Sequence, residues 1–228
     1  MTAAGTPARP GEPRLIVFDC DGTLVDGQGA VVSAMGAAFA QFALPTPEAG
    51  LIRRSVGLSL PQAVRRLAPD SDDEAVRDIV DAYKSAFRAA RAAGELSEPL
   101  FAGMAELLGA LVAAGCTLGV ATGKSDRGLE HCLDTHGIAH LFVTLQTADR
   151  HPSKPHPAML EAALAAAGAR PEQAVMIGDT AYDMLMAVEA GVRAIGVAWG
   201  YHEPEELIEA GAEYVAATID ELRTYLLR

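Results

Sequence analysis

Residues 15–23 read Leu-Ile-Val-Phe-Asp-Cys-Asp-Gly-Thr, and this stretch carries the strongest signal for the fold. Its four apolar residues form the short continuous run that is typical of a strand buried on both faces of a parallel sheet. Two carboxylates, Asp19 and Asp21, follow directly. Ligands of open α/β sheets bind just beyond the carboxyl ends of the strands, so we expect both aspartates in a binding crevice. A plain turn after a strand is the alternative, because Asp and Gly are common turn residues.

Two further apolar runs also end in polar residues. Residues 118–121 lead into Thr122 and Gly123, and residues 174–177 lead into Asp179, with Asp183 one helical turn later. If these strands are parallel neighbours of the first, their ends converge on one crevice. A hydroxyl with backbone amides can hold phosphate oxygens, and several carboxylates can hold a hard cation such as Mg²⁺.

The order of the predicted elements indicates an α/β fold with a parallel sheet. From residue 99 onward, helical patterns alternate with apolar runs. We expect strands at 116–121, 141–144, 174–177, 192–198 and 213–216, and helices at 103–114, 125–136, 157–167, 181–190, 203–210 and 219–227. The class is therefore a Rossmann-like parallel sheet core.

Residues 27–95 interrupt this alternation. They contain no convincing strand, and helices are expected at 28–43, 47–55, 60–68 and 72–93, with breaks at Pro45, Gly57 and Pro69. We therefore predict an all-helical cap domain at 27–95, inserted after the first strand into a catalytic core of 14–26 and 96–228. Residues 1–13 read as a loose N-terminal tail. An insertion at this point would cover the carboxyl end of the sheet as a lid.

Composition narrows the partners. The formal net charge is -12, which argues against nucleic acid and against an anionic membrane surface. It does not exclude an anionic substrate, because a metal and one lysine can reverse the field locally. The three cysteines, Cys20, Cys116 and Cys132, have neither CxxC spacing nor disulfide density, which predicts a reducing, cytoplasmic location. We expect a monomer or homodimer.

Lys154 supplies a positive charge in the Pro-flanked loop Pro-Ser-Lys-Pro-His-Pro, in a chain that has only two other lysines, Lys84 and Lys124. A compact ammonium suits a point contact to a carboxylate or a phosphoryl oxygen. With this residue the set resembles the haloacid-dehalogenase-type phosphohydrolases, across nearly all of residues 14–228. The four motifs, in order, are Asp19-Cys-Asp21-Gly-Thr23, then Thr122, then Lys154, then Gly178-Asp179-Thr-Ala-Tyr-Asp183. The stretch Gly196-Val-Ala-Trp-Gly-Tyr201 is similar to the phosphoglycolate-phosphatase-like branch.

The resemblance implies a role for each residue. Asp19 would be the nucleophile that carries an aspartyl phosphate, and Asp21 the acid and base. Thr122 and Lys154 would be catalytic groups that hold phosphoryl oxygens, and Asp183 would orient Lys154 or a metal-bound water. Mg²⁺ would be bound by the Asp19 carboxylate, the Asp21 backbone carbonyl and the Asp179 carboxylate. Its partner would be a small phosphorylated metabolite.

Four further residues are candidates for substrate binding. Cys20 and Gly123 would bind the substrate, with backbone amides near Asp21 and Gly123 on the phosphoryl oxygens. Arg53 and Arg54, in the helical insertion, could meet the far end of the substrate, although a solvated helix face is an equal alternative. A nucleophilic role for the Cys20 thiol is disfavoured, since neighbouring carboxylates raise a thiol pKa.

The expected activity is hydrolysis of a phosphate monoester, and two alternatives stay open. A β-phosphoglucomutase-type mutase would share all four motifs. That reaction needs a cation in the cap for a second phosphate, and the loop from Gly57 to Gln62 has none. Inorganic pyrophosphatase activity is the other alternative. Dehalogenase activity is excluded by the resemblance, because those enzymes lack an acid/base residue at the position of Asp21.

Overall fold

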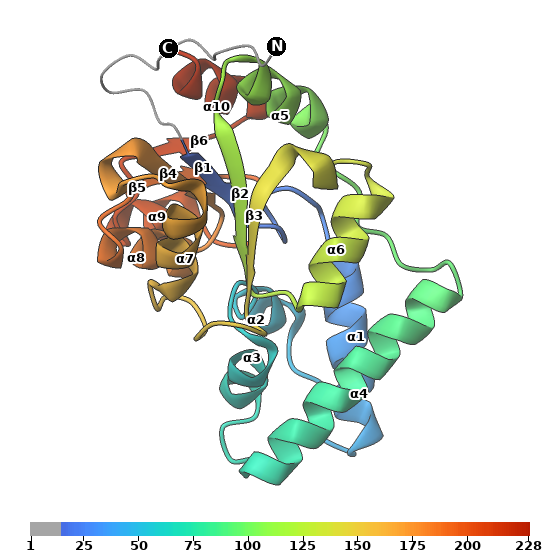
Figure 1. The fold of residues 1–228 in the computed structure, drawn as a ribbon. Coiled ribbons are helices and arrows are strands. Elements are labelled where there is room, and N and C mark those ends of the chain that lie inside the picture. Colours follow the sequence, from blue (N-terminus) through green and yellow to red (C-terminus); the bar gives the residue numbers. More distant parts are fainter. Residues whose placement is uncertain (1–14) are drawn as a thin grey trace.

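The computed structural model describes residues 15–228, so the predicted tail at 1–13 lies outside the described residues. Its centre is a six-stranded sheet in the order β3-β2-β1-β4-β5-β6, with every neighbouring pair parallel (Figure 1). The strands are β1 (Leu15–Phe18), β2 (Thr117–Thr122), β3 (Phe142–Thr147), β4 (Ala174–Gly178), β5 (Arg193–Val197) and β6 (Tyr214–Ala216). The predicted Rossmann-like sheet is confirmed.

Strand β1 lies in the middle of the sheet, with β2 on one side and β4 on the other. Phe18 is in register with Val120 of β2 and with Ile177 of β4. The backbone N–H of Asp19 donates to the Ile177 carbonyl at 2.9 Å. The chain therefore enters the crevice with Asp19 between the ends of β2 and β4, where the strand order reverses and ligands of such sheets bind.

Both faces of the sheet are covered by helices. Because side chains alternate along a strand, Ile16 and Phe18 pack on one face, and Leu15 and Val17 on the other. The first face is covered by α5 (Met104–Ala113), α6 (Asp126–Thr135) and α10 (Ile219–Leu226), and the second by α7 (Ala158–Ala167), α8 (Ala181–Glu189) and α9 (Pro204–Glu209) (Figure 1). Two short 3-10 turns, η1 (Ala139–Leu141) and η2 (Pro171–Gln173), precede β3 and β4.

Four helices between β1 and α5 form the predicted helical insertion, which we call the cap. They are α1 (Gln28–Gln41), α2 (Ala49–Arg53), α3 (Leu60–Leu67) and α4 (Asp73–Ala92). They bury an apolar core of their own, to which Met35, Phe39, Ile52, Val64 and Ile79 belong. Figure 1 places the cap beyond the carboxyl ends of the strands. The boundary predicted at residue 27 falls just before α1, and the boundary predicted at residue 95 falls just after α4.

The third strand in the chain differs from its prediction. It was expected at 141–144, but Leu141 belongs to η1 and the strand continues to Thr147. Its last residues are polar yet buried, since the side chain of Gln146 donates to Thr144 and that of Thr147 donates to Asp126. Apolar periodicity alone misses a strand end of this kind.

No helix within residues 15–228 combines the length and the apolar character that crossing a bilayer requires.

Candidate active site

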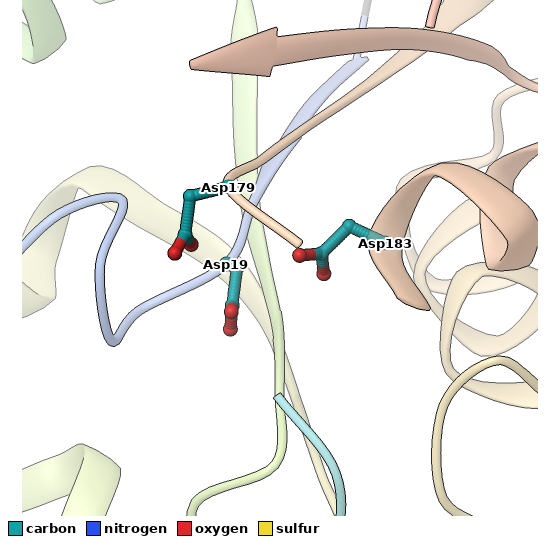
Figure 2. A group of neighbouring side chains, drawn as sticks. All are labelled: Asp19, Asp179 and Asp183. Atoms are coloured by element: carbon teal, nitrogen blue, oxygen red, sulfur yellow. The ribbon is translucent and has the colours of Figure 1, made fainter. Parts of the chain in front are cut away.

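Three buried carboxylates meet where β1, β4 and α8 approach one another. Asp19 follows β1, Asp179 follows β4, and Asp183 lies in the first turn of α8; Figure 2 shows the three side chains close together, with Asp183 directed from α8 toward the other two. One oxygen of each lies within 4.8 Å of the others. Burial raises the pKa of Asp19 to about 7, and the nearby Asp183 and Asp21 carboxylates add to this against the opposing effect of Lys154.

Lys154 provides the buried positive charge next to these carboxylates. Its ammonium lies 2.6 Å from Asp183 Oδ1 and 3.0 Å from Asp19 Oδ1, and its side chain is fully buried. Burial alone would lower the pKa of Lys154, but Asp183 and Asp19 outweigh this effect and raise it, so the residue is a cation. Lys154 therefore holds one oxygen of Asp19, and the Cys20 backbone N–H donates to the same oxygen at 2.6 Å.

Both carboxylate oxygens of Asp183 accept hydrogen bonds from neighbouring groups. Besides Lys154, it accepts from the Thr180 hydroxyl at 2.6 Å and from the Thr180 N–H at 3.1 Å. These contacts cap the start of α8. The arrangement gives Asp183 the geometry expected of a residue that orients Lys154.

Asp179 is held by two donors, the Thr23 hydroxyl at 2.8 Å and the Tyr201 N–H at 2.9 Å. Burial, with the nearby Asp19 and Asp183, raises the pKa of Asp179 well above its ordinary range. The turn after β1 comes so close that a Cβ on Gly22 would lie 2.1 Å from Asp179 Oδ2, and Gly22 has φ +82°. Only glycine satisfies both requirements at this position.

Asp21 belongs to a second charged group beside the first. Its Oδ1 lies 3.0 Å from the Lys124 ammonium, which also donates to Glu98 at 2.6 Å. All three side chains are nearly buried, and burial raises the pKa of Asp21 against the opposing effect of Lys124. Glu98 lies on the segment that returns from the cap to the core, so this ion-pair chain links Asp21 to that segment.

A cavity of about 610 Å³ lies between the cap and the core and opens onto these groups. Asp19, Asp21, Thr122 and Gly123 line it on the core side. The cap packs directly against Gly123, because a Cβ there would lie 2.5 Å from the Leu58 carbonyl oxygen. The predicted catalytic and phosphate-holding residues are therefore brought together, with Lys154 and Asp179 buried just behind them.

Three of the residues predicted to contact the substrate lie outside the cavity lining. Arg53 and Arg54 are exposed and outside the cavity lining, and Arg54 instead forms an ion pair with Glu206 of α9. Cys20 is also outside the lining. Its Sγ lies 3.9 Å from Cys132 Sγ in the core, and this contact together with burial raises the pKa of the Cys20 thiol well above its ordinary value.

Sequence reasoning missed two groups of residues at the site. Lys124 and Glu98 are not among the predicted site residues; the scarcity of lysine is a signal for the first, and nothing in the sequence points to the second. The other group lies on α4, where Lys84, Arg88 and Arg91 line the cavity. Their spacing of four and seven residues places them on one helix face, which was a usable signal.

The donor set fits a hard divalent cation. Asp19 Oδ2 is buried and has no hydrogen-bond partner within the described residues. Four aspartates face two lysines in the two charged groups, so negative charge is in excess at this point. Carboxylate oxygens are the ligands that Mg²⁺ prefers. Asp19 and Asp179 are the residues whose carboxylates could hold such an ion, since Asp183 is already engaged with Lys154.

Comparison with known proteins assigns the family. The family model described as haloacid dehalogenase-like hydrolase matches residues 16–197. The chain belongs to this family. Among curated members, it is 36% identical to probable phosphatase IndB of Dickeya dadantii, over 91% of both chains. It is 33% identical to tyrosine-protein kinase PtkA of Mycobacterium tuberculosis, over 95% of this chain and 74% of that protein.

Two more relatives of the haloacid dehalogenase-like family bear on the site. Phosphoglycolate phosphatase 1 of Pseudomonas aeruginosa is 30% identical, over 94% of this chain and 79% of that protein. A crystal structure of a predicted phosphatase from Clostridium acetobutylicum superposes with a TM-score of 0.86 at 26% identity, covering 95% of this chain and 99% of the other. Both the family and the fold that the motifs indicated are thus confirmed, and so is assignment as an enzyme of this hydrolase family.

Proposed function

We propose that this protein is a Mg²⁺-dependent phosphatase that hydrolyses a small phosphate monoester through an aspartyl phosphate on Asp19. The observation that carries the proposal is the grouping of Asp19, Asp21 and Asp179 at the ends of β1 and β4 with Lys154 from the loop after β3, beside a cavity. Relatives named as phosphatases support the reaction class.

The chemistry divides between the two aspartates. Lys154 and the Cys20 amide hold Asp19 Oδ1, which fixes the orientation of the carboxylate. Asp19 attacks phosphorus, the bond from phosphorus to the ester oxygen breaks, and Asp21 gives a proton to the departing oxygen. Asp21 then takes a proton from water, which attacks the aspartyl phosphate and releases phosphate and free Asp19.

The remaining groups bind and orient. Thr122 and the Gly123 amide lie at the cavity wall, where they can hold phosphoryl oxygens. Asp19 and Asp179 would hold Mg²⁺ together with the Asp21 backbone carbonyl, and the ion would offset repulsion between the carboxylates and the incoming phosphate. Asp183 fixes Lys154. The cap covers the cavity and so limits access of bulk water.

The names of the relatives suggest a first candidate for the substrate class. One of them is named phosphoglycolate phosphatase, so a phosphoglycolate-like monoester is the first candidate. A phosphosugar mutase is the second candidate, and one observation favours it: three cations of α4 line the cavity, whereas the loop from Gly57 to Gln62 supplies no cation for a second phosphate. Retention of a second phosphate on these cations would allow its transfer.

One panel experiment separates these functions. Phosphate release is measured with Mg²⁺ from para-nitrophenyl phosphate, phosphoglycolate and pyrophosphate, with and without excess EDTA. Monoester hydrolysis that EDTA abolishes is expected, whereas full activity in EDTA contradicts the metal dependence. In a parallel incubation with β-glucose 1-phosphate and a trace of its bisphosphate, conversion to glucose 6-phosphate faster than phosphate release would assign a mutase instead.

A further inference from the structure

Helix α4 forms one wall of the cavity, and the hydrolysis steps proposed above use none of its side chains. Two aromatic and three cationic residues of this helix line the cavity: Tyr83, Lys84, Phe87, Arg88 and Arg91. Residues three, four and seven positions apart share one face of a helix. From Tyr83 to Arg91 this face spans about 12 Å, which is eight steps of 1.5 Å along the helix axis. It is long enough to contact a leaving group well beyond the phosphoryl site.

The aromatic part of the wall offers ring faces. Tyr83 and Phe87 lie with centroids 5.7 Å apart and planes tilted by 31°. Two cations flank Phe87, with Arg91 Cζ and Lys124 Nζ each 5.8 Å from its centroid. Apart from Ser55 and Ser59, the other cap residues that line the cavity, such as Met35, carry no polar side chain. Such a wall suits a flat apolar body, because aromatic pairs and cations over ring faces both favour stacked groups.

The cationic part of the wall contacts neutral groups of α4: Arg88 donates to the Ser85 hydroxyl at 2.9 Å, and Arg91 Cζ lies 5.8 Å from the Phe87 ring centroid. The structure describes the whole cap, which contributes three cations and no carboxylate to the cavity lining. Within residues 15–228, none of Lys84, Arg88 and Arg91 forms an ion pair with a carboxylate. The Arg91 Nε atom is buried without a hydrogen-bond partner. In a chain of net charge -12, this concentration of unpaired positive charge points to an anionic ligand.

The size of the cavity bears on the same question. Cavities of roughly 300–1,000 Å³ hold drug-sized ligands, and this one measures about 610 Å³. The two-carbon leaving group of phosphoglycolate would fill little of it. Apolar surface left against water in the complex would contribute nothing to binding.

We propose that the preferred substrate is a phosphate monoester whose leaving group is a flat, aromatic-type body that carries a second anionic group. Tyr83 and Phe87 contact the ring, and Arg91 binds the second anion, with Lys84 and Arg88 beside it. This inference rests on the proposed phosphatase function and adds the substrate class to it. The second anion can be a carboxylate or a second phosphate, since both are bound by the same guanidinium chemistry.

The test compares kcat/KM for matched esters. Benzyl phosphate and 4-carboxybenzyl phosphate have leaving groups of similar reactivity, so their difference reports recognition of the carboxylate. The bisphosphate of 1,4-benzenedimethanol tests a second phosphate in the same place. We expect kcat/KM for at least one of the two esters that carry a second anionic group to exceed that for benzyl phosphate about tenfold or more. The kcat/KM for phosphoglycolate should lie below that for both benzyl esters.

Two substitutions assign the effect to α4. Arg91→Gln is expected to reduce the preference for the carboxybenzyl ester to within about threefold, as loss of a charge-assisted hydrogen bond would. Phe87→Ala should lower kcat/KM for both benzyl esters more than for phosphoglycolate. Arg77→Gln is the matched control, because Arg77 lies on the same helix but is exposed and outside the cavity lining.

Two results would overturn the inference, and they are distinguishable. Hydrolysis of monoesters with phosphoglycolate above both benzyl esters, or a preference that survives Arg91→Gln unchanged, overturns the substrate class and leaves the phosphatase assignment intact. No hydrolysis of any monoester overturns the proposed function and this inference with it.

Discussion

Removal of the Lys154 ammonium is expected to destabilise the fold strongly. Lys154→Met keeps a similar length but leaves the Asp19 and Asp183 carboxylates, now 3.0 Å and 2.6 Å from the ammonium, without their shared cation. Breaking a buried ion pair by removing one partner costs about 3–5 kcal/mol. For a chain of this size each kcal/mol corresponds to roughly 2–4 °C in Tm, so a fall of about 6–20 °C is expected.

Two conditions should reduce the destabilisation, because both reduce the uncompensated charge. Adding Asp183→Asn to Lys154→Met removes one carboxylate, so the double variant should be more stable than the single one. Lowering the pH should also help. A buried carboxyl such as Asp19, whose pKa is raised to about 7, takes up a proton in the folded state that the unfolded chain takes up only at lower pH. The folded variant therefore gains stability as the pH falls from 7 towards 5.

The assay is urea unfolding in EDTA at pH 5 and pH 7.5, followed by far-UV circular dichroism. The free energy of unfolding is compared for the wild type, the single variant and the double variant. A single variant within about 1 kcal/mol of the wild type at both pH values would refute the argument, since that is the range of an exposed pair. A double variant that is no more stable than Lys154→Met would refute it as well.

Three further predictions concern the metal and the acid/base group. Asp179→Asn should weaken Mg²⁺ binding at least about tenfold, whereas Asp21→Asn should leave it within a few-fold; the reverse order in titration calorimetry would exchange their roles. Because Mg²⁺ needs the deprotonated carboxylates of Asp19 and Asp179, whose pKa values are both raised by burial, that of Asp19 to about 7, the Mg²⁺ affinity should rise at least about tenfold per pH unit from pH 5 to 7. A flat profile would contradict this. Glu98→Gln leaves the ammonium beside Asp21 with one carboxylate partner, so kcat should fall about tenfold with KM nearly unchanged. Glu95→Gln, at an exposed position of the same connection, is the control. Equal losses of kcat in both variants would point to a general effect on the connection between cap and core.

The sheet and the main charged group could be predicted from sequence because both follow from local patterns. Short apolar runs mark buried strands, and parallel strands bring their carboxyl ends to one edge. This reasoning placed Asp19, Thr122 and Asp179 together without any knowledge of distances. The cap was predictable for the same reason. Its sequence contains four stretches of helical periodicity and no strand pattern, which distinguishes it from the alternating strands and helices of the core.

The contacts between cap and core could not be predicted in this way. They depend on how two separately folded units meet, and no local pattern records that orientation. Arg53 and Arg54 come just before the Gly57 turn, yet neither lines the cavity, while Arg91, far along another helix, does. Glu98 meets Lys124 across the return connection, 26 residues apart in the chain.

The central claim is that Asp19 becomes phosphorylated and that the resulting aspartyl phosphate is then hydrolysed. One chemical measurement tests this claim directly. The enzyme is mixed with substrate and Mg²⁺, quenched in acid during the first turnovers, and reduced with borohydride, which converts an aspartyl phosphate into homoserine. Peptide mass spectrometry then locates the change. Homoserine is expected at position 19 of the wild type after reaction with substrate, and none is expected without substrate. Asp19→Asn should show no turnover. A phosphoryl group on another residue, or retained turnover in Asp19→Asn, would contradict it.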